Sequence, residues 1–162
     1  MEKFLPRRPR LQHDTPGWVD DPEFFITVCC AQRGWNQLCY PDISALVFES
    51  FRFYHNQYSC RTELLVLMPD HFHAILKVPD RLNLASWTSD LKHWLSRKGK
   101  VVFQENFFDH RLRSALDAAQ KWRYVDENPV RAGLIKRSED WPYRFTSMDF
   151  QSVGRAVPRP PR

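Results

Sequence analysis

The sequence contains few of the residues that define several protein classes. Its 162 residues include five glycines and four cysteines, which excludes a collagen-like chain and a scaffold dense in disulfides. No apolar run approaches the roughly 18 residues that a membrane-spanning helix needs. The opening MEKFLPRRPRLQ also lacks the apolar segment of a secretory signal. We therefore expect a cytoplasmic protein.

The cysteines do not form a metal-binding pattern. None lies in a C-x-x-C pair, so the spacing does not predict a zinc knuckle. Cys29 and Cys30 are adjacent in an apolar stretch. The simplest interpretation is free thiols that are buried in a reducing cytoplasm.

What is present fits one folded, moderately basic domain. Hydrophobic residues make up 43% of the chain and aromatic residues 14%, which is enough for a core. The 24 lysines and arginines exceed the 19 acidic residues by five. This excess permits a polyanionic partner but suits an ordinary basic protein equally well. We expect a basic, proline-rich arm over 1–22, the folded domain over 23–150 and a second basic, proline-rich tail over 151–162.

Hydrophobic patterning predicts alternating strands and helices. We expect strands over 24–31, 63–68 and 70–78, with a fourth inside 101–108. Helices are predicted over 43–56, 84–99 and 114–128, with Asp42, Asn83 and Ser114 as N-caps. This order favours an α+β fold, a ferredoxin-like sandwich in which helices pack on one face of an antiparallel sheet.

The third predicted strand carries two histidines. Side chains alternate along a strand, so His71 and His73 share the face opposite an apolar set formed by Phe72, Ala74, Leu76 and Val78. Two imidazoles placed in this way can reach one cation. An isolated H-x-H triplet is nevertheless common, and a catalytic metal site needs a third ligand and open positions.

The last predicted helix carries a tyrosine on its polar side. Tyr124 lies nearly opposite the centre of an apolar stripe, and Asn128 follows one turn later. The stripe consists of Ala115, Ala118, Ala119, Trp122 and Val125. Alone, this is an ordinary half-exposed tyrosine. Beside a metal-suited histidine pair it becomes a candidate nucleophile, which needs a base or an electrophilic partner because a free phenol has a pKa near 10.

Two segments resemble a known family. MPDHFHAIL resembles the MPNHxHLL signature of the HUH single-tyrosine transposases, which belong to the Y1 or IS200-like group. FFDHRLRS, followed by Tyr124-x3-Asn128-PVRAGLI, resembles the Y-I-x-x-N-P-V-R-A-G-L stretch of its branch of REP-associated tyrosine transposases. The resemblance covers about residues 20–145 in family order. Asp70 replaces the usual Asn, and Phe72 replaces a smaller aliphatic residue; neither change removes a functional group.

The resemblance implies a fold, a site and a reaction. His71 and His73 would bind Mg²⁺ or Mn²⁺, with Asn128 as third ligand. Tyr124 would attack the scissile phosphate of single-stranded hairpin DNA, which yields a 5′-phosphotyrosine and a free 3′-OH that can later be rejoined. Residues 23–150 would form the catalytic domain, as a monomer or a homodimer.

Basic residues near these motifs are candidates for DNA contacts. A charge run is usually a solvated face, so we expect about half of them to touch phosphate. The set is Arg7, Arg8, Arg10, Lys92, Arg97, Lys98, Lys100, Arg111, Arg113, Arg131, Lys136 and Arg137. Two other functions stay open: a non-catalytic binder of single-stranded nucleic acid, and a small metal-binding protein without a nucleic-acid role.

Overall fold

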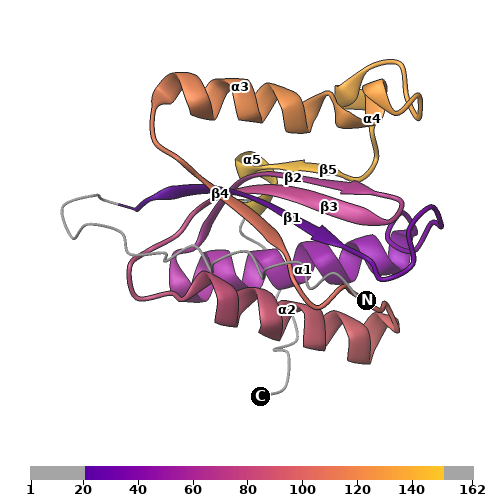
Figure 1. Cartoon of the computed structure of the whole chain (residues 1–162), viewed down its shortest axis with the longest axis horizontal. Coiled ribbons are helices and arrows are strands. Elements are labelled where there is room, and N and C mark those ends of the chain that lie inside the picture. Colours follow the sequence, from indigo (N-terminus) through magenta and orange to yellow (C-terminus); the bar gives the residue numbers. More distant parts are fainter. Residues whose placement is uncertain (1–20, 152–162) are drawn as a thin grey trace, which may run out of the picture.

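A five-stranded antiparallel sheet forms the middle layer of the protein (Figure 1). The computed structural model describes residues 21–151. The strand order is β4-β1-β3-β2-β5, which places β3 at the centre. The strands are β1 (Glu23–Cys29), β2 (Arg61–Met68), β3 (His71–Lys77), β4 (Phe108–Leu112) and β5 (Arg144–Thr146). The predicted α+β class is therefore confirmed.

Helices lie on both faces of this sheet (Figure 1). Helices α1 (Pro41–Tyr58) and α2 (Leu84–Gly99) cover one face, as predicted. Helix α3 (Ala115–Asp126), continued by the short α4 (Asn128–Arg131), lies over the other. The prediction that helices pack on one face thus holds for the first two, whereas α3 buries its own side chains against the opposite face. A 3₁₀ turn (Ser138–Asp140) and α5 (Ser147–Gln151) complete the order.

The larger core lies between the sheet and α1 and α2. Its aromatic centre includes Phe51, Phe72 and Trp87, whose rings meet edge to face. The alternation predicted for β3 is confirmed, because Phe72, Ala74, Leu76 and Val78 all belong to this core. A smaller cluster on the other face joins Val66 and Ile75 of the sheet to Val125 of α3.

Two of the three predicted N-caps are confirmed, because their side chains accept hydrogen bonds from amides in the first turn of the helix. The Asn83 side chain accepts a hydrogen bond from the Ser86 amide (2.9 Å), and Ser114 Oγ accepts one from the Asp117 amide (3.1 Å). Asp42 is not a cap: α1 begins earlier, with Tyr40 as N-cap and Pro41 as its first residue. Proline suits that position because its fixed φ matches the first turn and no amide is lost there.

The predicted strand inside 101–108 is wrong. That segment forms one isolated bridge, between Phe103 and Cys30, and the strand begins only at Phe108. A further edge strand, β5, pairs with β2 and was not predicted. No helix within residues 21–151 is long and apolar enough to cross a membrane.

All four cysteines are free thiols. Cys30, Cys39 and Cys60 are buried, and burial raises the pKa of each to about 12. Cys29 is partly exposed and lies on β1 opposite His71. The predicted proline-rich arm and tail, with Arg7, Arg8 and Arg10, lie almost entirely outside the described residues.

Candidate active site

The two histidines lie side by side at the start of the central strand. His71 begins β3, and His73 follows on the same face, which is the face turned toward α3. Their ring centroids are 4.8 Å apart. Antiparallel pairing places Thr27 and Val66 opposite His73, so neighbouring strands flank this imidazole on both sides.

Each imidazole has a hydrogen-bond partner at Nδ1. His71 Nδ1 lies 2.7 Å from Asp70 Oδ1, and His73 Nδ1 lies 2.7 Å from Thr27 Oγ1. The Phe25 ring stacks on His73, with centroids 5.4 Å apart. The polar pair is therefore set into an otherwise apolar part of the sheet.

Both imidazoles are neutral near pH 7. His73 is 5% exposed, and its burial is the main cause that lowers its pKa to about 3. The positive charges of Arg33, Lys121 and Arg131, and of His71 when it is protonated, act in the same direction. Burial also lowers the pKa of His71, against the opposing effect of the Asp70 carboxylate. Neutral imidazole is the form that binds a metal ion.

Helix α3 brings Tyr124 to the histidines. The Tyr124 ring centroid lies 6.0 Å from that of His73 and 6.2 Å from that of Phe25, which it meets edge-on. The ring remains 43% exposed. The predicted stripe is only partly correct, because Ala115 and Ala119 are exposed. The prediction that Tyr124 lies nearly opposite the apolar stripe is wrong, because its ring lies at the edge of the buried face and contacts the sheet.

Two cations surround this tyrosine. Lys121 Nζ lies 5.2 Å from the Tyr124 ring centroid and 4.8 Å from that of Phe25. The Arg131 guanidinium lies 4.5 Å from the Tyr124 ring and donates a hydrogen bond to the Tyr124 carbonyl. Lys121 was not among the predicted site residues, although its position three residues before Tyr124 is a spacing that brings helical side chains together. The positive charges of Lys121 and Arg131 therefore lie next to the Tyr124 ring.

Polar contacts hold both ends of α3 against the sheet. Near its start, Asp117 Oδ2 lies 3.5 Å from His110 Nε2 of β4. At its end, Asp126 accepts hydrogen bonds from Arg144 of β5 (2.6 Å) and from Ser138 (2.8 Å). The shorter contacts, those of Asp126, hold the end of α3 that carries Tyr124 near the sheet.

Asn128, the predicted third ligand, lies just beyond the end of α3. Helix α3 ends at Asp126, Glu127 is its C-cap, and Asn128 begins α4 with Pro129 next. Within residues 21–151, no group of three or more His, Cys, Asp or Glu side chains could hold a metal ion. The histidine pair thus fits a metal ion in part: two nitrogen ligands are together, and further ligands must be amide, water or phosphate oxygens.

The other predicted DNA-contact residues are distributed around the fold. Helix α2 carries Lys92, Arg97 and Lys98, with Lys100 directly after it, on the side of the sheet away from the histidines (Figure 1). Lys92 is also engaged by the backbone carbonyls of Gln104 and Glu105.

Strand β4 and the segments around α3 and α4 carry the rest. Arg111 pairs in register with Phe24 of the larger core, so it faces away from His73. Arg113 precedes α3 and Lys136 follows α4, both exposed, and Arg137 forms an ion pair with Asp140. Of the predicted contacts, the structure places Arg131 against Tyr124.

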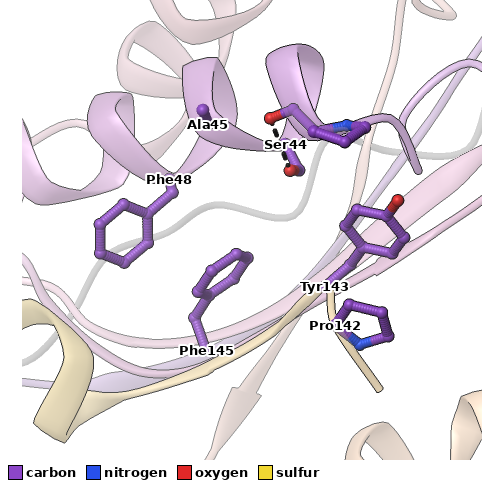
Figure 2. Close-up of a pocket in the computed structure, with 7 residues that line it drawn as sticks. Ser44, Ala45, Phe48, Pro142, Tyr143 and Phe145 are labelled. Atoms are coloured by element: carbon purple, nitrogen blue, oxygen red, sulfur yellow. Dashed lines mark hydrogen bonds between the residues drawn. The ribbon is translucent and has the colours of Figure 1, made fainter. Parts of the chain in front are cut away.

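A separate hollow lies between α1 and the segment around β5 (Figure 2). Its volume is about 380 Å³, and Figure 2 shows Phe48, Tyr143 and Phe145 around it. Its lining contains no charged side chain: Pro41, Ser44, Ala45, Phe48, Pro142, Tyr143 and Phe145. Phe48 and Phe145 pack against the larger core, so the hollow is on the face opposite the histidines.

Fold and site together define a class: an antiparallel sheet that presents a histidine pair to a tyrosine-bearing helix. Comparison with known proteins confirms the resemblance to REP-associated tyrosine transposases. The chain is 31% identical over 81 residues to the REP-associated tyrosine transposase of Escherichia coli K12, a match covering 48% of this chain and 49% of that protein.

A second relative and a solved structure agree. The chain is 26% identical over 112 residues to the putative REP-associated tyrosine transposase of Haemophilus influenzae, covering 59% of this chain and 64% of that one. The matches thus span between about half and two thirds of these relatives. A REP-associated tyrosine transposase solved bound to a REP hairpin has a TM-score of 0.70 at 19% identity, over 92% of this chain and 95% of that one, which shows a shared fold. No family model matches the chain.

Proposed function

We propose that this protein is a metal-dependent endonuclease and strand transferase that acts on single-stranded hairpin DNA through a 5′-phosphotyrosine. The observation that carries the proposal is the approach of Tyr124 to His73, at 6.0 Å between ring centroids, beside a second imidazole. The relatives named as REP-associated tyrosine transposases support it, as does the solved relative bound to a REP hairpin. A DNA substrate is consistent with the cytoplasmic location expected from the sequence.

The histidine pair is the proposed metal site. His71 and His73 would hold Mg²⁺ or Mn²⁺, with Asn128 as a third ligand and open positions for water and phosphate oxygens. When bound, the ion would polarise the scissile phosphate as a Lewis acid. Because both imidazoles are neutral near pH 7, the site needs no proton release before it binds a cation.

Tyr124 is the proposed nucleophile. Its phenol oxygen would form a bond to phosphorus while the bond from phosphorus to the 3′-oxygen breaks, and the phenol proton would finally reside on the released 3′-oxygen. Attack by a 3′-OH on the phosphotyrosine reverses the step and joins strands. Lys121 and Arg131, whose cationic groups lie over the Tyr124 ring, would attract the phosphate and stabilise negative charge that develops during the attack.

The decisive test is the covalent adduct. Protein incubated with labelled hairpin DNA and Mn²⁺ should form a complex that survives denaturing electrophoresis, and Tyr124→Phe should abolish it completely while hairpin binding persists. Tyr58→Phe is a matched control, because Tyr58 is similarly exposed (42%) but lies at the end of α1. An adduct formed by the Tyr124→Phe protein would overturn the mechanism.

A second candidate is a non-catalytic binder of single-stranded nucleic acid. It is favoured by the lack, within the described residues, of three or more His, Cys, Asp or Glu side chains grouped for a metal. This function predicts that the unmodified protein binds hairpin DNA without forming any adduct at any Mn²⁺ concentration.

A further inference from the structure

We propose that Asp70 is a positioning residue: its carboxylate fixes the His71 ring so that Nε2, not Nδ1, is presented to a divalent cation. The Thr27 hydroxyl permits the same arrangement at His73 without enforcing it. The inference rests on the proposed function and deepens it. Asp70 stands where the family resemblance predicts Asn, so the negative charge behind His71 distinguishes this chain from the family signature.

The donor and acceptor chemistry of the Asp70 contact has one solution. A neutral imidazole carries one N–H and one lone-pair nitrogen. An ionised carboxylate only accepts hydrogen bonds, so at 2.7 Å from Asp70 Oδ1 the His71 Nδ1 must carry the proton. The lone pair of His71 is then on Nε2, which is the atom left to bind a cation.

Thr27 imposes a weaker constraint on His73. A hydroxyl both donates and accepts, so the 2.7 Å contact between Thr27 Oγ1 and His73 Nδ1 is compatible with either tautomer. When His73 Nε2 binds a cation, Nδ1 carries the proton and the hydroxyl accepts from it. Thr27 therefore permits the required tautomer, whereas Asp70 enforces it.

The Asp70 carboxylate is itself held from its other side. Asp70 Oδ2 accepts a hydrogen bond from the Gly34 amide at 2.7 Å, and the Arg33 guanidinium lies 3.4 Å from Oδ1. Arg33 also donates to the Asp70 carbonyl at 3.1 Å. Gly34 has a φ of +82°, a backbone conformation that residues other than glycine rarely adopt. The loop after β1 thus pre-sets the carboxylate before any ligand arrives.

A carboxylate behind a ligating imidazole raises the basicity of the ligand and fixes the orientation of its ring. Loss of such a partner typically lowers metal affinity about 10- to 100-fold. The structure therefore predicts an order of effects: removal of the Asp70 carboxylate weakens cation binding most, and removal of the Thr27 hydroxyl weakens it less.

The test measures Mn²⁺ affinity by isothermal titration calorimetry on the full chain without DNA. Asp70→Ala should bind Mn²⁺ about 10- to 100-fold more weakly than the unmodified protein. Asp70→Asn should lose less, because its amide oxygen still accepts the hydrogen bond. Thr27→Val should lose least, and Asp80→Ala, an exposed aspartate in a turn, should be unchanged.

A second readout needs no metal. Long-range ¹H–¹⁵N spectra of the metal-free protein should show His71 with its proton on Nδ1, and Asp70→Ala should shift His71 toward the other tautomer. The inference is overturned if His71 carries its proton on Nε2, or if Asp70→Ala binds Mn²⁺ as tightly as Asp80→Ala does. If Asp70→Ala fails to fold, the tautomer of His71 in the unmodified protein decides alone: a proton on Nε2 overturns the inference.

The variant His71→Ala distinguishes a failure of the proposed metal site from a failure of the positioning role alone. If His71→Ala binds Mn²⁺ as tightly as the unmodified protein, the ion is bound elsewhere, and both the metal role and the positioning role fall. If His71→Ala abolishes binding while Asp70→Ala changes nothing, the metal site stands and only the positioning role falls.

Discussion

The two faces of the sheet are built by different means. On the side of α1 and α2, 21 buried residues form one continuous apolar cluster with aromatic rings at its centre. On the side of α3, the cluster holds seven buried residues, and polar contacts fix both ends of the helix. His71, His73 and Tyr124 all lie on this second side.

The difference separates stability from chemistry. Apolar burial supplies most of the free energy of folding, so the α1–α2 face is expected to dominate stability. The α3 face buries fewer apolar side chains and contains the buried imidazoles and the half-exposed phenol. Directional hydrogen bonds supply part of its stabilisation. Substitutions on the two faces should therefore affect different measurements.

Truncation in the larger core should have the largest effect on stability. Phe51→Ala removes a ring that is 1% exposed and meets both Phe72 and Trp87 edge to face. We expect a loss of about 3–5 kcal/mol in the free energy of unfolding, because lost burial is added to a cavity. Urea denaturation followed by circular dichroism measures it. A loss below that of Asp126→Ala would contradict the division between faces.

Breaking the anchor of α3 should have an intermediate effect. Asp126→Ala removes the acceptor of both Arg144 and Ser138 and leaves the half-buried guanidinium without this partner. We expect a loss of about 1–3 kcal/mol in the free energy of unfolding. Because the helix end also positions Tyr124, adduct formation should slow more than hairpin binding weakens. Equal changes in both would indicate that the anchor supports the fold alone.

The buried His73 should make stability dependent on pH. Its pKa is lowered to about 3 in the folded protein, against about 6.5 when unfolded, so below pH 6.5 the unfolded state binds the extra proton. Stability should therefore be full above pH 6.5 and fall by about 1.4 kcal/mol per pH unit as the pH drops toward 3. Denaturation with a chelator present measures this slope. His73→Phe should flatten it, and an unchanged slope would contradict the assigned shift.

The exposed contact at the start of α3 should matter least. His110 and Asp117 approach within 3.5 Å, but the His110 side chain is half exposed. His110→Ala should change the free energy of unfolding by no more than about 0.5 kcal/mol, since exposed pairs contribute little. Thermal melts compared with Asp126→Ala test this. A loss as large as that of Asp126→Ala would show that the two ends of α3 are equally important.

Local patterns in the sequence predicted local structure well. Alternation along β3 was sufficient to place His71 and His73 on one face, and Asn83 and Ser114 cap the helices that they begin. Such features depend on neighbours a few residues away. The roles of the site residues remain predictions, although the structure brings Tyr124 to the histidines.

Features that depend on distant contacts were missed. Residues far along the chain, among them Val66 and Ile75, determine which side of α3 faces the sheet. The predicted apolar stripe therefore included residues that are exposed in the structure. Strand β5 has three residues and exists through its pairing with β2, which leaves too short a pattern to recognise. The apolar residues of 101–108 predicted a strand, yet a loop is enough to bury Val101 and to pack Phe103 against the larger core.

The uneven burial of the four cysteines gives the protein a built-in attachment point for a probe. Alkylating reagents attack thiolates, and Cys30, Cys39 and Cys60 are sequestered with a pKa of about 12. Cys29 is the partly exposed thiol, and it pairs in register with His71. A maleimide fluorophore should therefore couple at Cys29 first. Its emission would report changes in the surroundings of His71 without any engineered residue.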